Sequence, residues 1–153
     1  MIKVELAQKN DLSAILAVQK KAFKEEAVLC NDDGIQPMVQ TLKELESEYK
    51  EMTFLKATID KEIIGSVRAI MKGDDCYIAK LLVHPNHRKK GIGKLLMAEI
   101  EKNFRDAKRF KLATVAKSKH NIIFYLSQNY EITGRGIFHD EVDAVFLTKK
   151  NEI

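Results

Sequence analysis

The stretch that most constrains the fold is residues 80–96, in which a strand, a basic turn and a helix follow one another directly. Residues 76–83 are rich in apolar and β-favouring side chains, and Pro85 ends the run because proline cannot continue a β-ladder. After the turn, apolar residues recur at spacings of three and four, which places them on one face of a helix: Ile92, Leu95, Leu96, Ile100 and Phe104. The stretch therefore predicts a helix N-terminus at the carboxyl end of a strand.

The turn between this strand and helix is both basic and rich in glycine. Arg88, Lys89 and Lys90 precede Gly91 and Gly93. A helix N-terminus presents free backbone N–H groups and the positive end of the helix dipole, so it binds anions and above all phosphates. Glycine suits such a place because a backbone that approaches an oxyanion closely has no room for Cβ atoms. The turn is therefore predicted to bind phosphate, and the alternative is an ordinary solvated basic turn.

Two common phosphate-binding motifs do not fit the turn. A Walker loop needs glycine where Arg88 stands and serine or threonine where Leu95 stands. A dinucleotide fingerprint needs a third glycine where Leu96 stands. The turn is therefore expected to belong to neither class.

Hydrophobic periodicity along the rest of the chain predicts an α/β (α+β) fold. The expected order is strand, two helices, three strands, helix, strand, helix and two strands, which gives a mixed, mostly antiparallel sheet of about seven strands flanked by about four helices. The strands are expected at 2–7, 53–59, 63–71, 76–83, 110–116, 130–133 and 141–148, and the helices at 12–26, 38–49, 92–104 and 118–129. Ser118 is expected to cap the last helix, and Gly134 and Gly136 are expected in the turn between the last two strands.

Composition narrows the class of protein. The 153 residues, 45% of them hydrophobic, suit a single domain over residues 1–153. The net charge of +4 comes from 26 basic and 22 acidic residues that are intermixed, which favours anionic ligands without indicating a polycationic arm. Cys30 and Cys76 lack paired or metal-like spacing, so no metal site is expected. No stretch approaches the roughly 18 apolar residues of a membrane span, so a cytoplasmic protein without membrane contact is expected.

The strand and turn resemble a known family. Val83-His84-Pro85 followed by residues 88–93 is similar to the V-x-P and R/Q-x-x-G-x-G/A signature of the GNAT superfamily of N-acetyltransferases, and the predicted element order is also the GNAT order. The resemblance implies acetyl-coenzyme A as co-substrate. It implies that the strand end, Leu81, Leu82 and Val83, lends backbone groups to the pantetheine arm and the thioester carbonyl. It also implies that the turn and helix start bind the pyrophosphate, through Arg88, Lys89, Lys90, Gly91, Ile92, Gly93 and Lys94.

The late helix carries a second resemblance to the same family. Ser118, Asn121 and Tyr125 match an S-x-x-N-x-x-x-Y variant, with Asn129 where many members have glycine. The resemblance implies that Ser118 and Asn121 contact the coenzyme and that Tyr125 is the acid that protonates the departing thiolate. The residues alone leave another interpretation open, in which Tyr125 is a boundary tyrosine with a packed ring and a solvated hydroxyl.

The proton acceptor and the acceptor substrate are less defined. Residues 76–83 contain no Glu or Asp, so the base is expected to be a water chain that ends on a carboxylate elsewhere. In the family, substrate choice tends to come from the segments corresponding to residues 29–36 and 135–143. Asp32 and Asp33 could form an acidic mouth for a cationic amine, together with three acidic residues near the end of the chain, Asp140, Glu141 and Asp143. Ordinary surface loops are the alternative.

The sequence therefore predicts an N-acetyltransferase that transfers acetyl from acetyl-coenzyme A to a primary amine of a small molecule or peptide. A coenzyme-binding sensor or regulatory domain without turnover stays open, because no base is evident. A nucleic-acid-binding module that uses residues 88–90 and 102–111 ranks lower, since no aromatic stacking platform accompanies those charges. A homodimer is expected from the family only.

Overall fold

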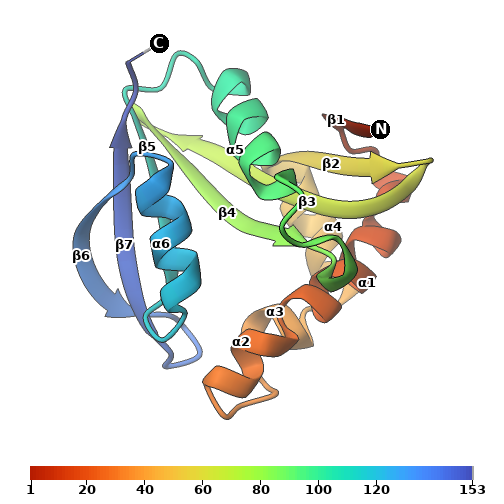
Figure 1. Ribbon diagram of the computed structural model, residues 1–153, viewed down its shortest axis with the longest axis horizontal. Coiled ribbons are helices and arrows are strands. Elements are labelled where there is room, and N and C mark those ends of the chain that lie inside the picture. The colour runs from red at the N-terminus through yellow and green to blue at the C-terminus, as the bar shows by residue number, and fades with distance from the viewer. Residues whose placement is uncertain (153) are drawn as a thin grey trace.

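A computed structural model describes residues 1–152 and shows one seven-stranded sheet in the order β1-β2-β3-β4-β5-β7-β6 (Figure 1). Neighbouring strands are antiparallel except for β4 and β5, which are parallel. This arrangement confirms the predicted mixed, mostly antiparallel sheet. The strands are β1 (Ile2–Leu6), β2 (Thr53–Ile59), β3 (Glu62–Lys72), β4 (Asp75–Val83), β5 (Arg109–Val115), β6 (Glu131–Ile137) and β7 (Asp143–Lys150).

Helices cover both faces of the sheet. The helix α5 lies over β2, β3 and β4, while α1 packs on β3 and β4 and also against α4. The helix α6 lies in front of β5 and β7 in Figure 1. The main core fills the space between the sheet, α5 and α6, and a smaller core lies between the sheet, α1 and α4. The helices are α1 (Leu12–Ala22), α2 (Lys24–Leu29), α3 (Gln36–Val39), α4 (Leu42–Glu51), α5 (Ile92–Asn103) and α6 (Lys119–Ser127), with 3-10 turns η1 (Lys9–Asp11) and η2 (Pro85–His87).

The helices before β2 differ from the prediction. The expected helix 12–26 is two helices that meet at Phe23, and the second of them, α2, ends at Leu29, three residues beyond the expected end. The expected helix 38–49 is also divided, into α3 and α4. The reason is a capping box, in which the Thr41 side chain accepts a hydrogen bond from the Glu44 backbone N–H while Glu44 binds the Thr41 backbone N–H. Residues 1–152 therefore contain six α-helices rather than about four.

The two late glycines lie in a strand and not in a turn. Gly134 and Gly136 belong to β6, and the chain turns at 138–142, where the Phe138 backbone N–H donates to the Val142 carbonyl at 2.9 Å. The Phe146 ring on the paired strand β7 explains why glycine is needed. A Cβ atom on Gly136 would lie 2.6 Å from Cζ of that ring, closer than real Cβ atoms come. These glycines therefore serve close cross-strand packing.

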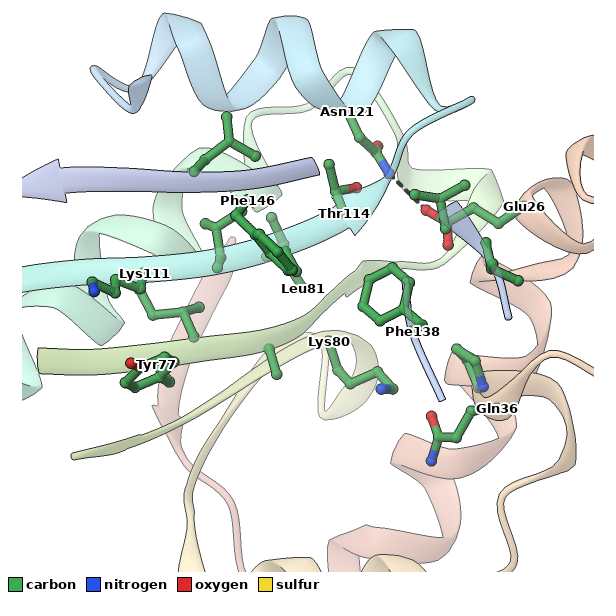
Figure 2. A pocket seen from close by; sticks show the side chains of 18 of the residues that line it. Glu26, Gln36, Tyr77, Lys80, Leu81, Lys111, Thr114, Asn121, Phe138 and Phe146 are labelled. Carbon is green, nitrogen blue, oxygen red and sulfur yellow. Dashed lines mark hydrogen bonds between the residues drawn. The ribbon is translucent and has the colours of Figure 1, made fainter. Parts of the chain in front are cut away.

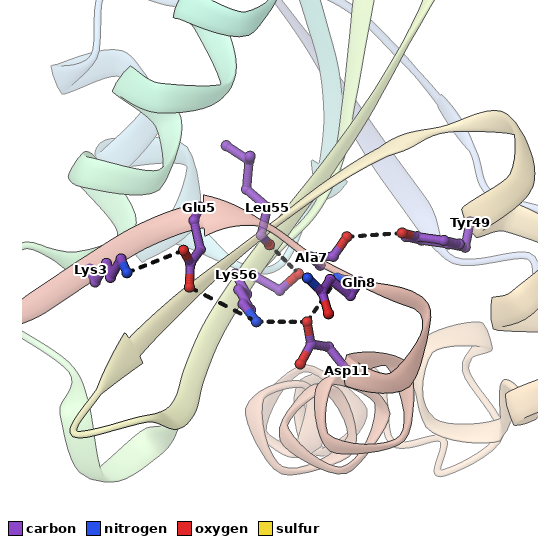
Figure 3. A network of polar contacts seen from close by, with 9 residues as sticks. Lys3, Glu5, Ala7, Gln8, Asp11, Tyr49, Leu55 and Lys56 are labelled. Carbon is purple, nitrogen blue, oxygen red and sulfur yellow. Dashed lines mark hydrogen bonds and ion pairs between the residues drawn. The ribbon is translucent and has the colours of Figure 1, made fainter.

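A polar network holds the first helices to the edge of the sheet (Figure 3). Lys56 Nζ on β2 lies 2.7 Å from Asp11 Oδ2, which also accepts the Gln8 backbone N–H at 2.8 Å. From α4, the Tyr49 hydroxyl donates to the Ala7 carbonyl at 2.9 Å. These contacts fix the start of α1 and the end of α4 relative to β1 and β2.

Candidate active site

The candidate site lies where the two parallel strands in the middle of the sheet separate. β4 and β5 pair only at their beginnings, Asp75 with Arg109, Cys76 with Phe110, and Tyr77 with Lys111. Asp75 closes this end, with Oδ1 2.8 Å from Arg109 Nε and Oδ2 3.2 Å from Lys111 Nζ. Beyond these residues the strands diverge (Figure 1). The sheet therefore opens at the carboxyl ends of its parallel pair, where ligands bind in open α/β sheets.

A β-bulge in β4 accompanies the divergence. On β3, Ser66 is opposite Leu82 and Arg68 is opposite Ala79, so two residues of β4 face one residue of β3. Lys80 lies in the bulge and has a φ of 54°, in the left-handed region that non-glycine residues seldom adopt. A bulge bends and twists its strand. This bend accounts for the departure of β4 from β5.

A cavity of about 740 Å³ fills the opening. Its walls come from β4, β5, β7 and α6, and from the segments around Glu26, Gln36 and Asp140 (Figure 2). The volume lies within the roughly 300–1,000 Å³ of pockets that enclose small ligands. Of the residues predicted for the site, Leu81, Asn121, Tyr125 and Asp140 line this cavity.

Tyr125 is part of the cavity wall and is 9% exposed. Its ring packs between Phe124 and Tyr130, with ring centroids 5.3 and 6.0 Å away. Burial and, to a smaller extent, the negative charge of Glu26 raise the pKa of Tyr125 above its ordinary value. The phenol therefore keeps its proton at neutral pH, as a proton donor must.

A buried carboxyl lies beside this tyrosine, and sequence reasoning missed it. Glu26 on α2 is 8% exposed, and its Oε1 accepts a hydrogen bond of 2.7 Å from Asn121 Nδ2, one turn before Tyr125 on α6 (Figure 2). Burial raises the pKa of Glu26 to about 7, opposed by the Asn121 hydrogen bond and by the positive charge of Lys80. No motif marks Glu26, because its neighbours in the site are distant in sequence. The coenzyme contact through Asn121 stays a prediction.

Lys80 brings a cation into the cavity from the bulge (Figure 2). Burial, with a smaller contribution from the charge of Arg68, lowers the pKa of Lys80, and the carboxylates of Glu48, Glu26 and Asp140 oppose this. Within residues 1–152 no carboxylate oxygen lies within 4.0 Å of its ammonium group, the distance that defines a salt bridge. Lys80 therefore contributes positive charge to the cavity without being neutralised by a direct partner.

The predicted phosphate-binding turn lies outside the cavity wall but is joined to it. Gly91 is the N-cap of α5 with a φ of 77°, and nothing lies within 4 Å of the position that a Cβ atom would take. Two residues further on, a Cβ atom on Gly93 would lie 3.5 Å from Phe124 Cζ and 3.8 Å from Leu81 Cδ2. The first turn of α5 therefore meets both α6 and the cavity strand β4, so that one extended ligand can contact the turn and the cavity.

The basic residues of the turn do not all face solvent freely. The Arg88 guanidinium pairs with Glu25 and also donates to the Ala22 carbonyl at 3.3 Å, which ties the turn to α1 and α2. Lys90 Nζ lies 3.3 Å from His87 Nδ1. Lys89 adopts a φ of 62°. The geometry of the turn thus places Arg88 in an ion pair, and its contact with phosphate stays a prediction.

The other predicted residues differ in their surroundings. Leu82 and Ile92 are buried in the core and Val83 is half-buried against it, so that any ligand contact there would be made by the backbone, whereas Lys94 is exposed. Ser118 precedes α6 but makes no capping hydrogen bond, which corrects the expected cap, and its buried Oγ lacks a partner among the described residues.

The expected acidic mouth is only partly present. Asp32 and Asp33 are exposed and do not line the cavity, and Asp32 Oδ1 accepts the Gly34 backbone N–H at 2.8 Å in a local turn. Asp140 does line the cavity, and its Oδ2 accepts the Gln36 backbone N–H at 2.9 Å. Substrate contacts by Asp32 and Asp33 stay predictions.

Comparison with known proteins identifies the class. Residues 17–130 match the model of the acetyltransferase (GNAT) family, and the chain belongs to this family of acyl-CoA N-acyltransferases, which use acetyl-coenzyme A. UPF0157 protein YqkA of Bacillus subtilis (strain 168) is 23% identical over 117 residues, which cover 76% of this chain and 34% of YqkA. The chain therefore spans about a third of the length of this curated relative.

Solved structures share the fold. PaiA N-acetyltransferase from Thermoplasma acidophilum, in complex with coenzyme A, superposes with a TM-score of 0.82 at 19% identity, covering 98% of this chain and 99% of that chain. Smu.2055 from Streptococcus mutans UA159 superposes with a TM-score of 0.83 at 16% identity, with coverage of 98% and 99%. These similarities show that the fold is that of GNAT proteins.

Over residues 1–152, no helix combines the length and the apolar character needed to cross a bilayer. Over the same residues, no group of three or more His, Cys, Asp or Glu side chains is arranged to hold a metal ion.

Proposed function

We propose that the protein transfers the acetyl group of acetyl-coenzyme A to a primary amine of a small molecule or peptide, with Tyr125 as general acid. The observation that carries the proposal is the opening between β4 and β5, which places Tyr125 in the wall of a cavity that is joined through Gly93 to the N-terminus of α5. A protein that only binds the coenzyme does not need a buried, protonated phenol at this place.

The α5 N-terminus suits the pyrophosphate. Gly91 leaves open space at the helix start, where the backbone N–H groups of the first turn have no partner within the helix. Hydrogen bonds to a charged phosphate oxygen are worth about 1.5–3 kcal/mol each, so a few of them support micromolar binding after the entropy of association is subtracted. The pantetheine arm would then lie along β4 past Leu81, with the thioester inside the cavity.

The chemistry inside the cavity needs few protein groups. A neutral amine attacks the thioester carbonyl, and the oxyanion that forms accepts hydrogen bonds from backbone N–H groups near Leu82 and Val83. The departing thiolate receives a proton from Tyr125. The phenol carries its proton at neutral pH, and the negative charge that develops on the departing sulfur draws that proton away, against the raised pKa of Tyr125. Asp32, Asp33 and Asp140 remain the proposed contacts of a cationic acceptor.

Coenzyme binding is tested by replacing the glycine at the helix start. Gly91→Glu puts bulk and negative charge against the pyrophosphate, so we expect acetyl-coenzyme A to raise the melting temperature of the wild type but not of the variant. Ligand at a hundredfold over its dissociation constant adds about 2.7 kcal/mol. Gly73→Glu is the matched control, because Gly73 also has positive φ and open space but lies in the turn between β3 and β4. Coenzyme binding retained by Gly91→Glu in calorimetry would contradict the assignment.

The role of the acid is tested by removing one hydroxyl. Tyr125→Phe is expected to lower turnover, read as thiol release with a panel of amines, by about 10²-fold or more while coenzyme affinity changes little. Tyr130→Phe is the matched control, since the Tyr130 hydroxyl donates to Glu101 Oε2 at 2.9 Å and is not in the cavity wall. Equal turnover of wild type and Tyr125→Phe would remove Tyr125 from the acid role. Coenzyme binding without turnover of any amine would favour a regulatory domain.

A further inference from the structure

Building on the proposed function, we propose that Glu26 accepts the proton released by the attacking amine, with Asn121 as the residue that positions its carboxylate. Acyl transfer to an amine releases a proton from nitrogen, and β4 carries no carboxylate beyond Asp75, which is paired with Arg109 and Lys111 at the closed end of the opening. The acceptor must therefore come from another element.

Glu26 is bound to a residue that lies one helical turn from the proposed acid. Asn121 and Tyr125 are four residues apart on α6, so both side chains leave the same face of that helix and both line the cavity. Glu26 Oε1 lies 2.7 Å from Asn121 Nδ2, and the charge of Glu26 acts on Tyr125. The hydrogen bond therefore holds the Glu26 carboxylate beside the turn of α6 that precedes Tyr125. An amine between them would have the base on one side and the thioester on the other.

The other two carboxylates of the cavity wall are bound by other groups. Glu48 forms an ion pair with the buried Arg68, and Asp140 accepts the Gln36 backbone N–H at 2.9 Å. Among the described carboxylates of the cavity wall, Glu26 is the one bound by a side-chain amide alone. A carboxylate in an ion pair is a weaker base because its charged form is already stabilised. Glu48 is therefore a weaker base, and Glu26 differs from Asp140 in being tied by Asn121 to the helix that carries Tyr125.

The electrostatics of the pocket suit this role. Burial raises the pKa of Glu26 to about 7, near the pH at which a general base works best. The charge of Lys80 from β4 and the Asn121 hydrogen bond from α6 lower this pKa. Glu26 in turn acts on Tyr125 from α6 and on Cys30 at the end of α2, while Asp140, in the turn between β6 and β7, acts on Lys80 and Cys30. Lys80 limits the rise, so that a useful fraction of Glu26 is ionised at neutral pH.

The step balances with two protein groups. The amine nitrogen forms a bond to the thioester carbon, the carbon–sulfur bond breaks, and the sulfur leaves with the proton of Tyr125. The Glu26 carboxylate takes the proton lost by nitrogen. The products are an amide and a free thiol. Glu26 then releases its proton to water and Tyr125 takes one up, which restores both groups.

The test compares pH profiles of kcat/KM for wild type, Glu26→Gln and Glu101→Gln, with an amine that the wild type acetylates. Glu26→Gln is expected to lower kcat/KM at pH 7 about 10²-fold or more and to lose the ascending limb near pH 7. The deficit should shrink at high pH, where hydroxide can accept the proton that nitrogen loses. Glu101→Gln should keep the limb, since Glu101 is equally buried, at 7% exposed, but binds Lys149 and Tyr130 away from the cavity.

Two readouts separate a base from a structural carboxyl. Asn121→Ala removes a hydrogen bond that favours the charged form, so the ascending limb should move to higher pH. Carbon-13 NMR of the Glu26 carboxyl in the wild type should show titration near pH 7.

The outcomes distinguish this inference from the proposed function. If the wild type acetylates an amine and the kcat/KM of Glu26→Gln stays within about threefold of the wild-type value, the base role is wrong and the proposed function stands. The same holds if the pH profile of Glu26→Gln keeps its ascending limb near pH 7. A Glu26 carboxyl that titrates near 4.5 would also overturn the base role. If the wild type binds the coenzyme and acetylates no amine, the proposed function fails and the base role fails with it.

Discussion

The buried carboxyl of Glu26 should destabilise the folded protein above neutral pH, whatever its part in catalysis. A Glu with a pKa of about 7 in the folded state and 4.5 in the unfolded state binds its proton more tightly when folded. Its contribution to stability is therefore fully present below pH 4.5 and is lost as the pH rises through 7. One pKa unit corresponds to about 1.36 kcal/mol, so ionisation costs the folded state roughly 3 kcal/mol at pH 8.

Replacing this carboxyl by an amide should remove the cost. Glutamine cannot ionise, and its Oε1 can still accept the hydrogen bond that Asn121 donates to Glu26. We expect Glu26→Gln to match the wild type near pH 4 and to exceed its free energy of unfolding by up to about 3 kcal/mol at pH 8. With a urea m-value of roughly 2 kcal/mol/M, the midpoint should rise by about 1–2 M.

The assay is urea denaturation of both proteins at several pH values between 4 and 8, followed by circular dichroism. Glu101→Gln serves as control with the opposite sign, because Glu101 Oε1 lies 2.8 Å from Lys149 Nζ and removing its charge breaks a partly buried ion pair. A difference between Glu26→Gln and wild type that does not change with pH would refute the reasoning, since it would mean that the carboxyl titrates alike in both states.

Two further predictions concern packing. Gly136→Ala should lower the free energy of unfolding by about 1–3 kcal/mol, because its Cβ would overlap the Phe146 ring, and Phe146→Leu in the same chain should recover part of the loss; an unchanged urea midpoint for Gly136→Ala would contradict this. Arg68→Ala should cost about 3–5 kcal/mol, since Arg68 is 1% exposed, pairs with Glu48 and stacks 4.7 Å from the centroid of the Phe54 ring; a loss below about 1 kcal/mol in thermal unfolding would show that water replaces these contacts.

Much of the fold is predictable because it is encoded locally. Alternating or continuous apolar runs mark every strand, and the bounds predicted for β2 are those observed. The glycines of β6 were misplaced because the demand for them comes from Phe146 on another strand. The division between α3 and α4 rests on a capping box at Thr41, which the apolar spacing across both helices conceals.

The candidate site is predictable only in the part that local motifs carry. Tyr125 and Asn121 belong to one helix and Leu81 to the strand before the turn, and all three line the cavity. Glu26 reaches the cavity through a contact with Asn121, which is 95 residues away in the sequence. Nothing in its own segment distinguishes it from Glu25, which is exposed and pairs with Arg88. Only tertiary packing makes one carboxyl a buried base candidate and leaves the other on the surface.

The bulge at Lys80 makes the cavity depend on the length of the chain as well as on its side chains. Because β4 has one residue more than β3 needs between Ala79 and Leu82, losing a single codon there would restore an even ladder. Leu82 would stay opposite Ser66, but β4 would lose the bend that turns it away from β5 and would be free to extend its pairing along β5. A frame-preserving deletion could thus yield a more regular sheet and abolish the site, a change that a scan of substitutions alone would never sample.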